Sequence, residues 1–137
     1  MDAILSIKPQ FVDEIVAGRK KYEFRKKGFK EQVNKIYVYA SSPVCKIIGE
    51  FLLGNILEGD PDRIWALTSA KAGISREYFD EYYEQKKVAY ALEITSFVTY
   101  KDPINPYETI AKFSPPQSFC YIRNGIENRG KTLFPHL

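Results

Sequence analysis

The sequence predicts an α+β fold in which a curved, mixed β-sheet closes into a small pseudo-barrel flanked by helices. The expected strands and helices neither alternate strictly nor repeat, which argues against a doubly wound α/β sheet. The 137 residues suit one domain, and a composition of 45% apolar and 27% charged residues is typical of a globular protein. We expect that domain to span residues 1–122. Residues 123–137 are polar, contain two glycines, and are predicted to be a loosely attached tail.

The N-terminal segment predicts a strand, a helix and a second strand, over residues 3–8, 9–17 and 20–25. Pro9 suits the first helical turn, where its missing N–H has no partner to lose. Four apolar residues then recur at the spacing of one helical face. Gly18 suits the left-handed conformation that ends many helices, so the helix is expected to stop there.

The second strand has two faces of different chemistry. Side chains alternate along a strand, so Lys21, Glu23 and Arg25 are expected on one face. Tyr22 and Phe24 are expected on the other face. The aromatic face can pack in a core while the charged face points outward, and this charged face is the first candidate for a functional site.

The rest of the chain completes the expected sheet and adds helices to it. Further strands are predicted over residues 33–40, 45–57, 88–100 and 117–122, with a charged loop at 26–32, helices beginning after Asp60 and Ser75, and a short helix at 107–113. Asp60 and Ser75 are helix-capping residue types, since their side chains accept bonds from the first free N–H groups. The helix after Ser75 carries aromatic residues at 78, 79, 82 and 83 along one stripe, which predicts core packing.

Charge is unevenly distributed along the chain. Residues 1–57 hold ten Lys or Arg against six Asp or Glu, a net charge of +4. Residues 58–87 hold five against seven, a net charge of −2. A basic N-terminal part beside an acidic middle suggests a polarised surface that suits an anionic partner.

Several functional classes are disfavoured by what the chain lacks. Cys45 and Cys120 have no metal-binding or redox spacing and are expected to be free thiols, and His136 is the only histidine. The sequence therefore predicts no metal site, no histidine-based catalytic triad and no cofactor. No signal peptide or membrane-length apolar run is visible, so we expect a cytoplasmic protein.

Five short segments in order resemble the ASCH domain family, which is related to PUA domains. They are residues 8–9 (KP), 18–25 (GRKKYEFR), 39–43 (YASSP), 48–51 (IGEF) and 115–119 (PPQSF). The resemblance spans about residues 3–122. It implies a PUA-like pseudo-barrel with a cleft beside strand 20–25, and a protein that binds RNA. Some members are assigned hydrolysis of N4-acetylcytidine, and some a ribonuclease activity.

The hydrolase members of that family differ from this chain in their catalytic residues. Their strand has the pattern Gly-x-Lys-Thr-x-Thr-x-Arg, and the Lys, the second Thr and a distant Glu form the catalytic group. Lys20 and Arg25 match the pattern, but Glu23 stands at the second Thr, and no acid occurs at residues 71–74, where the distant Glu is expected. A carboxylate does not replace a hydroxyl nucleophile without changing the chemistry. The sequence therefore favours binding over amide hydrolysis.

We expect the protein to bind RNA or a modified nucleoside in a basic cleft. The candidate ligand-binding residues are Lys8, Lys20, Lys21, Glu23, Arg25, Tyr39, Ser41, Ser42, Gln117 and Ser118. In this set the cations would hold phosphate, which guanidinium and ammonium groups recognise. Glu23 and Gln117 would hydrogen-bond a base edge, and Tyr39 or its neighbour Tyr37 would stack on a base.

The residue patterns leave alternatives open. Both tyrosines also suit a core, Glu23 also suits a surface salt bridge with Lys21 or Arg25, and Gln117 also suits a role in holding its own turn. The basic residues of the loop at 25–30 suit either phosphate contact or a solvated loop. If this loop and strand 20–25 together contact about four phosphates, the salt slope should be near −3. A hydrolase would use Lys20 as base and Glu23 as its acid–base partner. A protein adaptor would use the acidic helices of residues 60–84.

Overall fold

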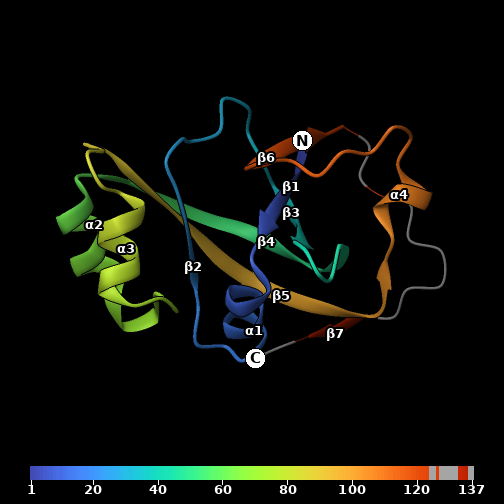
Figure 1. Ribbon diagram of the computed structural model, residues 1–137, viewed down its shortest axis with the longest axis horizontal. Helices are drawn as coiled ribbons and strands as arrows, with labels where there is room; N and C mark the ends of the chain where they lie inside the picture. The colour runs from blue at the N-terminus through green and yellow to red at the C-terminus, as the bar shows by residue number, and fades with distance from the viewer. Residues whose placement is uncertain (124–125, 127–132, 136–137) are drawn as a thin grey trace.

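The computed structural model describes residues 1–123, 126 and 133–135, and its strands form one curved sheet with helices around it (Figure 1). The strands in chain order are β1 (Asp2–Ile7), β2 (Tyr22–Arg25), β3 (Lys35–Ala40), β4 (Lys46–Gly59), β5 (Ala89–Ile104), β6 (Phe119–Ile122) and β7 (Leu133–Pro135). The helices are α1 (Pro9–Val16), α2 (Pro61–Thr68), the 3₁₀ turn η1 (Ser69–Lys71), α3 (Arg76–Tyr82) and α4 (Pro106–Thr109).

The sheet is mixed and its strand order is β2-β5-β4-β3-β1-β6, with β7 paired to β5. β1 runs parallel to β3, and the other pairs are antiparallel. Although β2 and β1 are far apart in this order, the Arg25 guanidinium at the end of β2 donates to the Ser6 carbonyl of β1 over 2.9 Å. The sheet therefore curls until its two ends approach each other, and the predicted α+β, PUA-like pseudo-barrel with flanking helices is confirmed.

The helices begin where the capping residues predict. The Asp60 side chain accepts from Asp62 N over 3.1 Å, and the Ser75 hydroxyl accepts from Tyr78 N over 3.0 Å. α4 begins at Pro106 and ends at Thr109, whereas a helix over 107–113 was expected. The helix begins one residue earlier than expected because Asn105 caps it and Pro106 occupies its first position.

Strand β3 is buried on both faces. Ile36 and Val38 belong to one apolar cluster, with residues of β1, α1 and β5. Tyr37 and Tyr39 belong to another, on the opposite face. The expected alternation is present, but both of its sides are covered.

The C-terminal segment differs in part from the expected loose tail. Within it, the structure describes residues 123, 126 and 133–135, and β7 pairs with Val98–Tyr100 of β5. Ile126 N donates to the Tyr37 hydroxyl over 3.1 Å. These residues add backbone pairing that the polar composition of the segment did not indicate, while His136 lies outside the described part of the chain.

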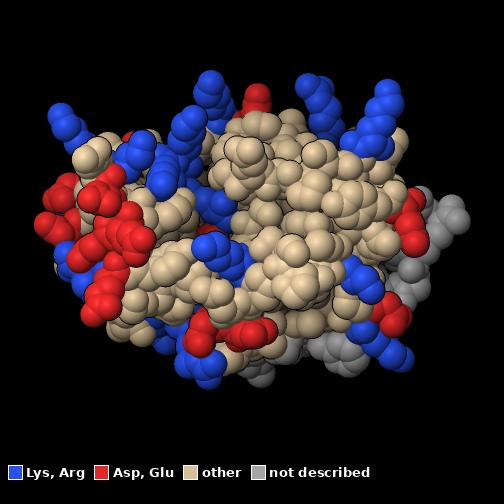
Figure 2. All heavy atoms as spheres, viewed as in Figure 1, with Lys and Arg blue, Asp and Glu red and all other residues tan. Residues whose placement is uncertain are grey.

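The helices α2 and α3 stand at one end of the long β4–β5 pair, and α4 stands at the opposite end (Figure 1). β2 and α1 lie between these ends. Figure 2 shows acidic side chains gathered over the α2–α3 end and basic side chains along the hollow beside it, in agreement with the charge polarity of the sequence. Among the described residues, no helix has the length and apolar character needed to cross a membrane.

Candidate functional site

A cavity of about 580 Å³ opens between the helical end of the molecule and the curled sheet. Its walls come from the end of β1, the first turn of α1, β2 and the loop after it, α3, and the turn before β6. This volume lies within the range of sites that hold small organic ligands. Segments far apart in the sequence therefore meet at one site, beside the strand that the sequence singled out.

Three charged side chains form the floor of the cavity, and all three are buried. Lys20, Glu23 and Arg25 are 1%, 7% and 7% exposed. The Glu23 carboxylate lies between the two cations: Oε2 is 2.8 Å from Arg25 Nη2, and Oε1 is 3.5 Å from Lys20 Nζ. The charged face of β2 was expected to point outward, but Glu23 and Arg25 are buried, with residues of α3 and of the turn before β6 lining the same cavity.

Lys20 is held by oxygen atoms and aromatic rings. Its ammonium donates to the Ala72 carbonyl over 2.8 Å and lies 4.8 Å from the centre of the Phe24 ring. Burial lowers the pKa of Lys20 below its ordinary value, while the nearby Glu23 carboxylate acts in the opposite direction. Lys20 is therefore the cation of this floor that most readily loses its proton.

Arg25 connects three segments of the chain. Besides Glu23 and the Ser6 carbonyl, it donates from Nη1 to the Ser118 carbonyl over 3.3 Å and to the Ser118 hydroxyl over 3.2 Å. Its Nε is buried without a hydrogen-bond partner among the described residues. Because both terminal nitrogens already donate to protein oxygens, Arg25 holds the site together rather than offering a free fork to a phosphate.

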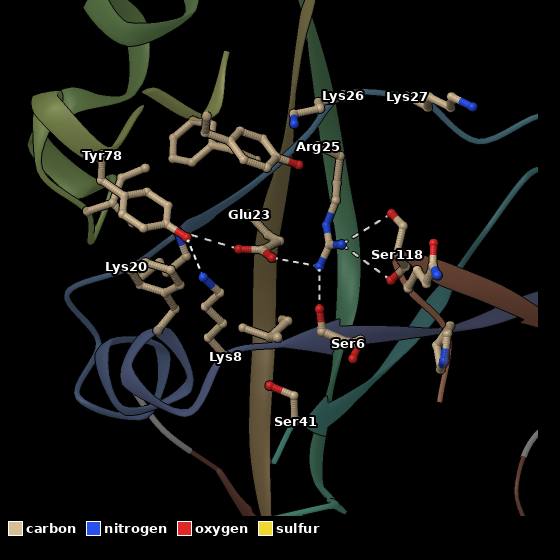
Figure 3. Close-up of a pocket in the computed structure, with 17 residues that line it drawn as sticks. Ser6, Lys8, Lys20, Glu23, Arg25, Lys26, Lys27, Ser41, Tyr78 and Ser118 are labelled. Atoms are coloured by element: carbon tan, nitrogen blue, oxygen red, sulfur yellow. Dashed lines mark hydrogen bonds and ion pairs between the residues drawn. The ribbon is translucent and has the colours of Figure 1, made fainter. Parts of the chain in front are cut away.

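The mouth of the cavity carries lysines and tyrosines (Figure 3). Lys8 Nζ donates to the Tyr78 hydroxyl over 3.1 Å and lies over that ring, 5.5 Å from its centre. Lys26 Nζ lies over the Tyr82 ring, 4.4 Å from its centre. Lys8, Lys26 and Lys27 are all exposed, so these ammonium groups can reach a ligand from solvent.

The structure brings seven of the ten predicted binding residues to the cavity: Lys8, Lys20, Glu23, Arg25, Ser41, Gln117 and Ser118. Figure 3 shows Lys8 and Lys20 on one side of Glu23, and Arg25 and Ser118 on the other. The cavity lining does not include Lys21, Tyr39 or Ser42.

The structure shows where two of the three remaining residues lie, Lys21 and Tyr39. Lys21 precedes β2; its backbone N–H donates to Lys71 O over 2.9 Å and its carbonyl accepts from Ile94 N over 2.8 Å. Tyr39 is 1% exposed and lies on the other face of the sheet, where its ring centre is 5.5 Å from that of Phe113. It is therefore a core residue and not a stacking surface for a ligand in this cavity.

Tyr78 and Tyr82 are among the cavity residues that sequence reasoning missed. The aromatic residues of α3, expected along one stripe, form two. Phe79 and Tyr83 lie in the core and are 0% and 3% exposed, whereas Tyr78 and Tyr82 are half-buried at the cavity wall. The signal in the sequence is the second i, i+4 pair, which is offset by one residue from the first pair. Its offset places it on a neighbouring face of the helix.

Among the described residues, no group of three or more His, Cys, Asp or Glu side chains lies close enough to hold a metal ion. Within the same part of the chain, Cys45 and Cys120 are free thiols and half-buried. The chemistry of this site therefore has to be argued from its lysines, its arginine, its glutamate and its hydroxyl groups.

The geometry agrees with a family comparison. The profile of the ASCH domain matches residues 5–98, about two-thirds of the chain, and includes α1, β2 and α3 of the cavity wall. The chain belongs to the ASCH domain family. The resemblance inferred from the five sequence segments is thus confirmed.

Solved and curated ASCH proteins extend the match to nearly the whole chain. The ASCH protein of Zymomonas mobilis superposes with a TM-score of 0.83 at 31% sequence identity, covering 90% of this chain and 88% of that one. A curated relative from Zymomonas mobilis subsp. mobilis, named an ASCH domain-containing ribonuclease, is 31% identical over 129 residues, 89% of this chain and 84% of the relative. A large ribosomal subunit protein uL22 of Ureaplasma parvum serovar 3 is 36% identical over 94 residues, which are 67% of this chain but 29% of that protein.

Proposed function

We propose that this ASCH domain binds RNA and holds one nucleotide in the cavity beside β2. The observation that carries the proposal is the charge of the cavity. Its only lining acid among the described residues is Glu23, which already lies between Lys20 and Arg25. The lysines at the mouth therefore face no competing carboxylate, and they leave the cavity strongly positive.

An anion is the ligand that such a site favours. Lys8, Lys26 and Lys27 are exposed at its rim, and ammonium groups bind phosphate as point charges. Gln117 and the Ser118 hydroxyl at the opposite rim supply neutral polar groups for a base or a ribose. A nucleotide unit of RNA combines these two chemistries in one molecule.

The test is the salt dependence of binding to labelled single-stranded RNA. If the three rim lysines each contact a phosphate, log Kd should change with log salt with a slope of about 2 in magnitude. The double variant Lys26→Ala/Lys27→Ala should bind roughly tenfold more weakly at 0.1 M salt and reduce the slope by about 1.

The matched control removes the same charge elsewhere. Lys86 and Lys87 are exposed and do not line the cavity. The variant Lys86→Ala/Lys87→Ala should retain nearly the wild-type affinity. Equal losses in the two double variants would mean that RNA binds through net charge alone, and the proposed site would be wrong.

RNA cleavage is a second candidate, favoured by the name of the Zymomonas relative and by Lys20. A lysine whose pKa is lowered by burial can be neutral and accept a proton, as activation of a ribose 2′-hydroxyl requires. Glu23, whose Oε1 is 3.5 Å from Lys20 Nζ, would be its acid–base partner.

Cleavage and binding are separated by following the products. Wild-type protein, Lys20→Met and Glu23→Gln are each incubated with RNA and, in a parallel sample, with N4-acetylcytidine. A ribonuclease at this site should give RNA fragments that both variants reduce by a factor of about 100 or more, the usual size of a general acid–base contribution. Fragments that persist in both variants would come from a contaminant, and this candidate would then be excluded.

A further inference from the structure

Two tyrosines of α3 line the cavity and are only partly buried, although Tyr82 also packs against the edge of an apolar cluster. Tyr78 and Tyr82 are one helical turn apart, line the cavity, and are half-buried, whereas Phe79 and Tyr83 on the adjacent stripe fill the core. A half-buried aromatic wall in a basic cavity offers a flat apolar surface next to cations. This is the combination that single-stranded nucleic-acid sites use.

Neighbouring rings fix both tyrosines through edge contacts. Phe11 meets Tyr78 edge to face at 4.9 Å between ring centres. Tyr83 meets Tyr82 in the same manner at 4.8 Å. Since the rings are already ordered, a ligand that stacks on them does not have to restrict them further.

Lysine ammonium groups, which can bind phosphate, lie beside these rings. Lys26 Nζ lies 4.4 Å from the centre of the Tyr82 ring, and Lys27 follows it at the rim. Lys8 is bonded to the Tyr78 hydroxyl and marks the other end of the wall. The distance between a base and its own phosphate is short, so one nucleotide can contact a tyrosine and the Lys26–Lys27 segment together.

The rest of the lining favours a base over a free phosphate. Phe11, Phe24 and Ile74 contribute apolar surface to the cavity, which a phosphate alone would not use. At the floor, the Glu23 carboxylate is an acceptor that is held in place by Arg25. It suits a ligand whose ring edge carries an N–H group, as nucleobases do.

We propose that Tyr78 and Tyr82 form the base-binding wall of the site, and that the ligand is an unpaired nucleotide whose base leaves the strand and stacks there. This inference rests on the proposed RNA binding and specifies its substrate class. A duplex is excluded because its bases are stacked within the helix and cannot enter the cavity, whereas bases in loops, bulges and single strands can.

The first experiment separates base from backbone contacts. The full chain is titrated with a labelled single-stranded RNA, with the same length of RNA in duplex form, and with an oligomer that keeps the ribose–phosphate chain but lacks the bases. The single strand should bind at least about tenfold more tightly than either of the others, given the usual contribution of one stacked base. Equal affinity for the single strand and the base-free oligomer would overturn the inference while leaving phosphate binding intact. No binding of any oligomer would overturn both.

The second experiment tests the rings. Tyr82→Leu and Tyr78→Leu should each weaken single-strand binding by about five- to a hundredfold, and Tyr82→Phe, which keeps the ring, should remain within about threefold of the wild type. Neither leucine variant should change binding of the base-free oligomer. Tyr107→Leu is the matched control, because Tyr107 is 53% exposed and outside the cavity lining.

Circular dichroism and thermal unfolding of each variant establish that it is folded before affinities are compared. If the leucine variants are folded and bind the single strand as tightly as the wild type, α3 is not the base-binding wall. If they lose the base-free oligomer equally, the rings act on the phosphate site and the inference is likewise wrong.

Discussion

Glu23 is the residue on which the electrostatics of this site depend. It is the acid between two buried cations, and it stands where the hydrolase pattern of the family has a threonine. Removing one partner from a buried ion pair leaves the other charge uncompensated in a poorly solvated place. Glu23 therefore stabilises the fold and determines how easily Lys20 loses its proton.

Glu23→Gln should lower the pKa of Lys20 further below its ordinary value of 10.5. Burial already lowers this pKa, and the variant removes the carboxylate that opposes the lowering. The free energy of unfolding should fall by about 3–5 kcal/mol at neutral pH. Titration of the Lys20 side-chain nitrogen by NMR, with Lys20→Met to assign the signal, measures the pKa directly.

The sign of the pH dependence follows from this shift. Because the folded-state pKa of Lys20 lies below the unfolded value, the unfolded chain binds more protons between the two values, so stability rises with pH across that window. In Glu23→Gln the folded-state pKa of Lys20 is lower still, so the rise of stability with pH should begin at a lower pH. Unfolding should be measured below pH 10, since burial raises the pKa of Tyr82 and of Tyr83, and stability held by their neutral hydroxyls is lost at higher pH. An unchanged Lys20 titration would show that Glu23 does not act on it.

The sequence identified most of the charged residues of the site, but it did not always predict which of them line the cavity. Lys20, Glu23 and Arg25 were all candidates, and all three line the cavity. Lys21 was placed with them because strand alternation was assumed from residue 20 onward, but β2 begins at Tyr22. Alternation gives the relative faces of residues within a strand and does not give the residue at which the strand starts.

At the scale of elements, local chemistry predicted the starts of helices better than the partners of their faces. Asp60 and Ser75 cap α2 and α3 through bonds within a few residues, so their effect is visible in the sequence. The surroundings of α3 depend on β2, on α1 and on the turn before β6, which are far away in the chain. For that reason the core stripe of α3 was predicted and its cavity stripe was not.

The same limit explains the burial of β2. Its aromatic face packs as expected, and the ring centres of Phe24 and Phe79 are 5.2 Å apart. Its charged face was expected to point outward, and charged residues are mostly exposed, yet Glu23 and Arg25 are buried. Sequence periodicity cannot show that the sheet curls and brings Ser6 and Ser118 against Arg25. Buried charge with satisfied partners is a tertiary property, and here it coincides with the candidate site.

At the scale of the whole molecule, Arg25 closes the sheet. It joins β2, the first strand in the sheet order, to β1 and to the turn before β6, which lie at the other end. The Ser118 carbonyl also accepts from Ser6 N over 3.1 Å. The turn before β6 is therefore bonded both to β1 and to Arg25 at the end of β2. A lysine at position 25 would keep the charge but lacks the planar fork that reaches several oxygens at once.

Arg25→Lys should therefore open the closure locally before the whole molecule unfolds. Leaving the Ser6 and Ser118 carbonyls without this donor should cost about 1–3 kcal/mol. Amide hydrogen exchange should show faster exchange at Ser6 N, while Phe79 N in α3, bonded to Ser75 O over 3.0 Å, keeps its protection. Ser118→Ala, which removes only the hydroxyl acceptor, should have a smaller effect at the same amide. If Ser6 and Phe79 lose protection equally in Arg25→Lys, the guanidinium contributes to global stability alone, and the sheet does not depend on it for closure.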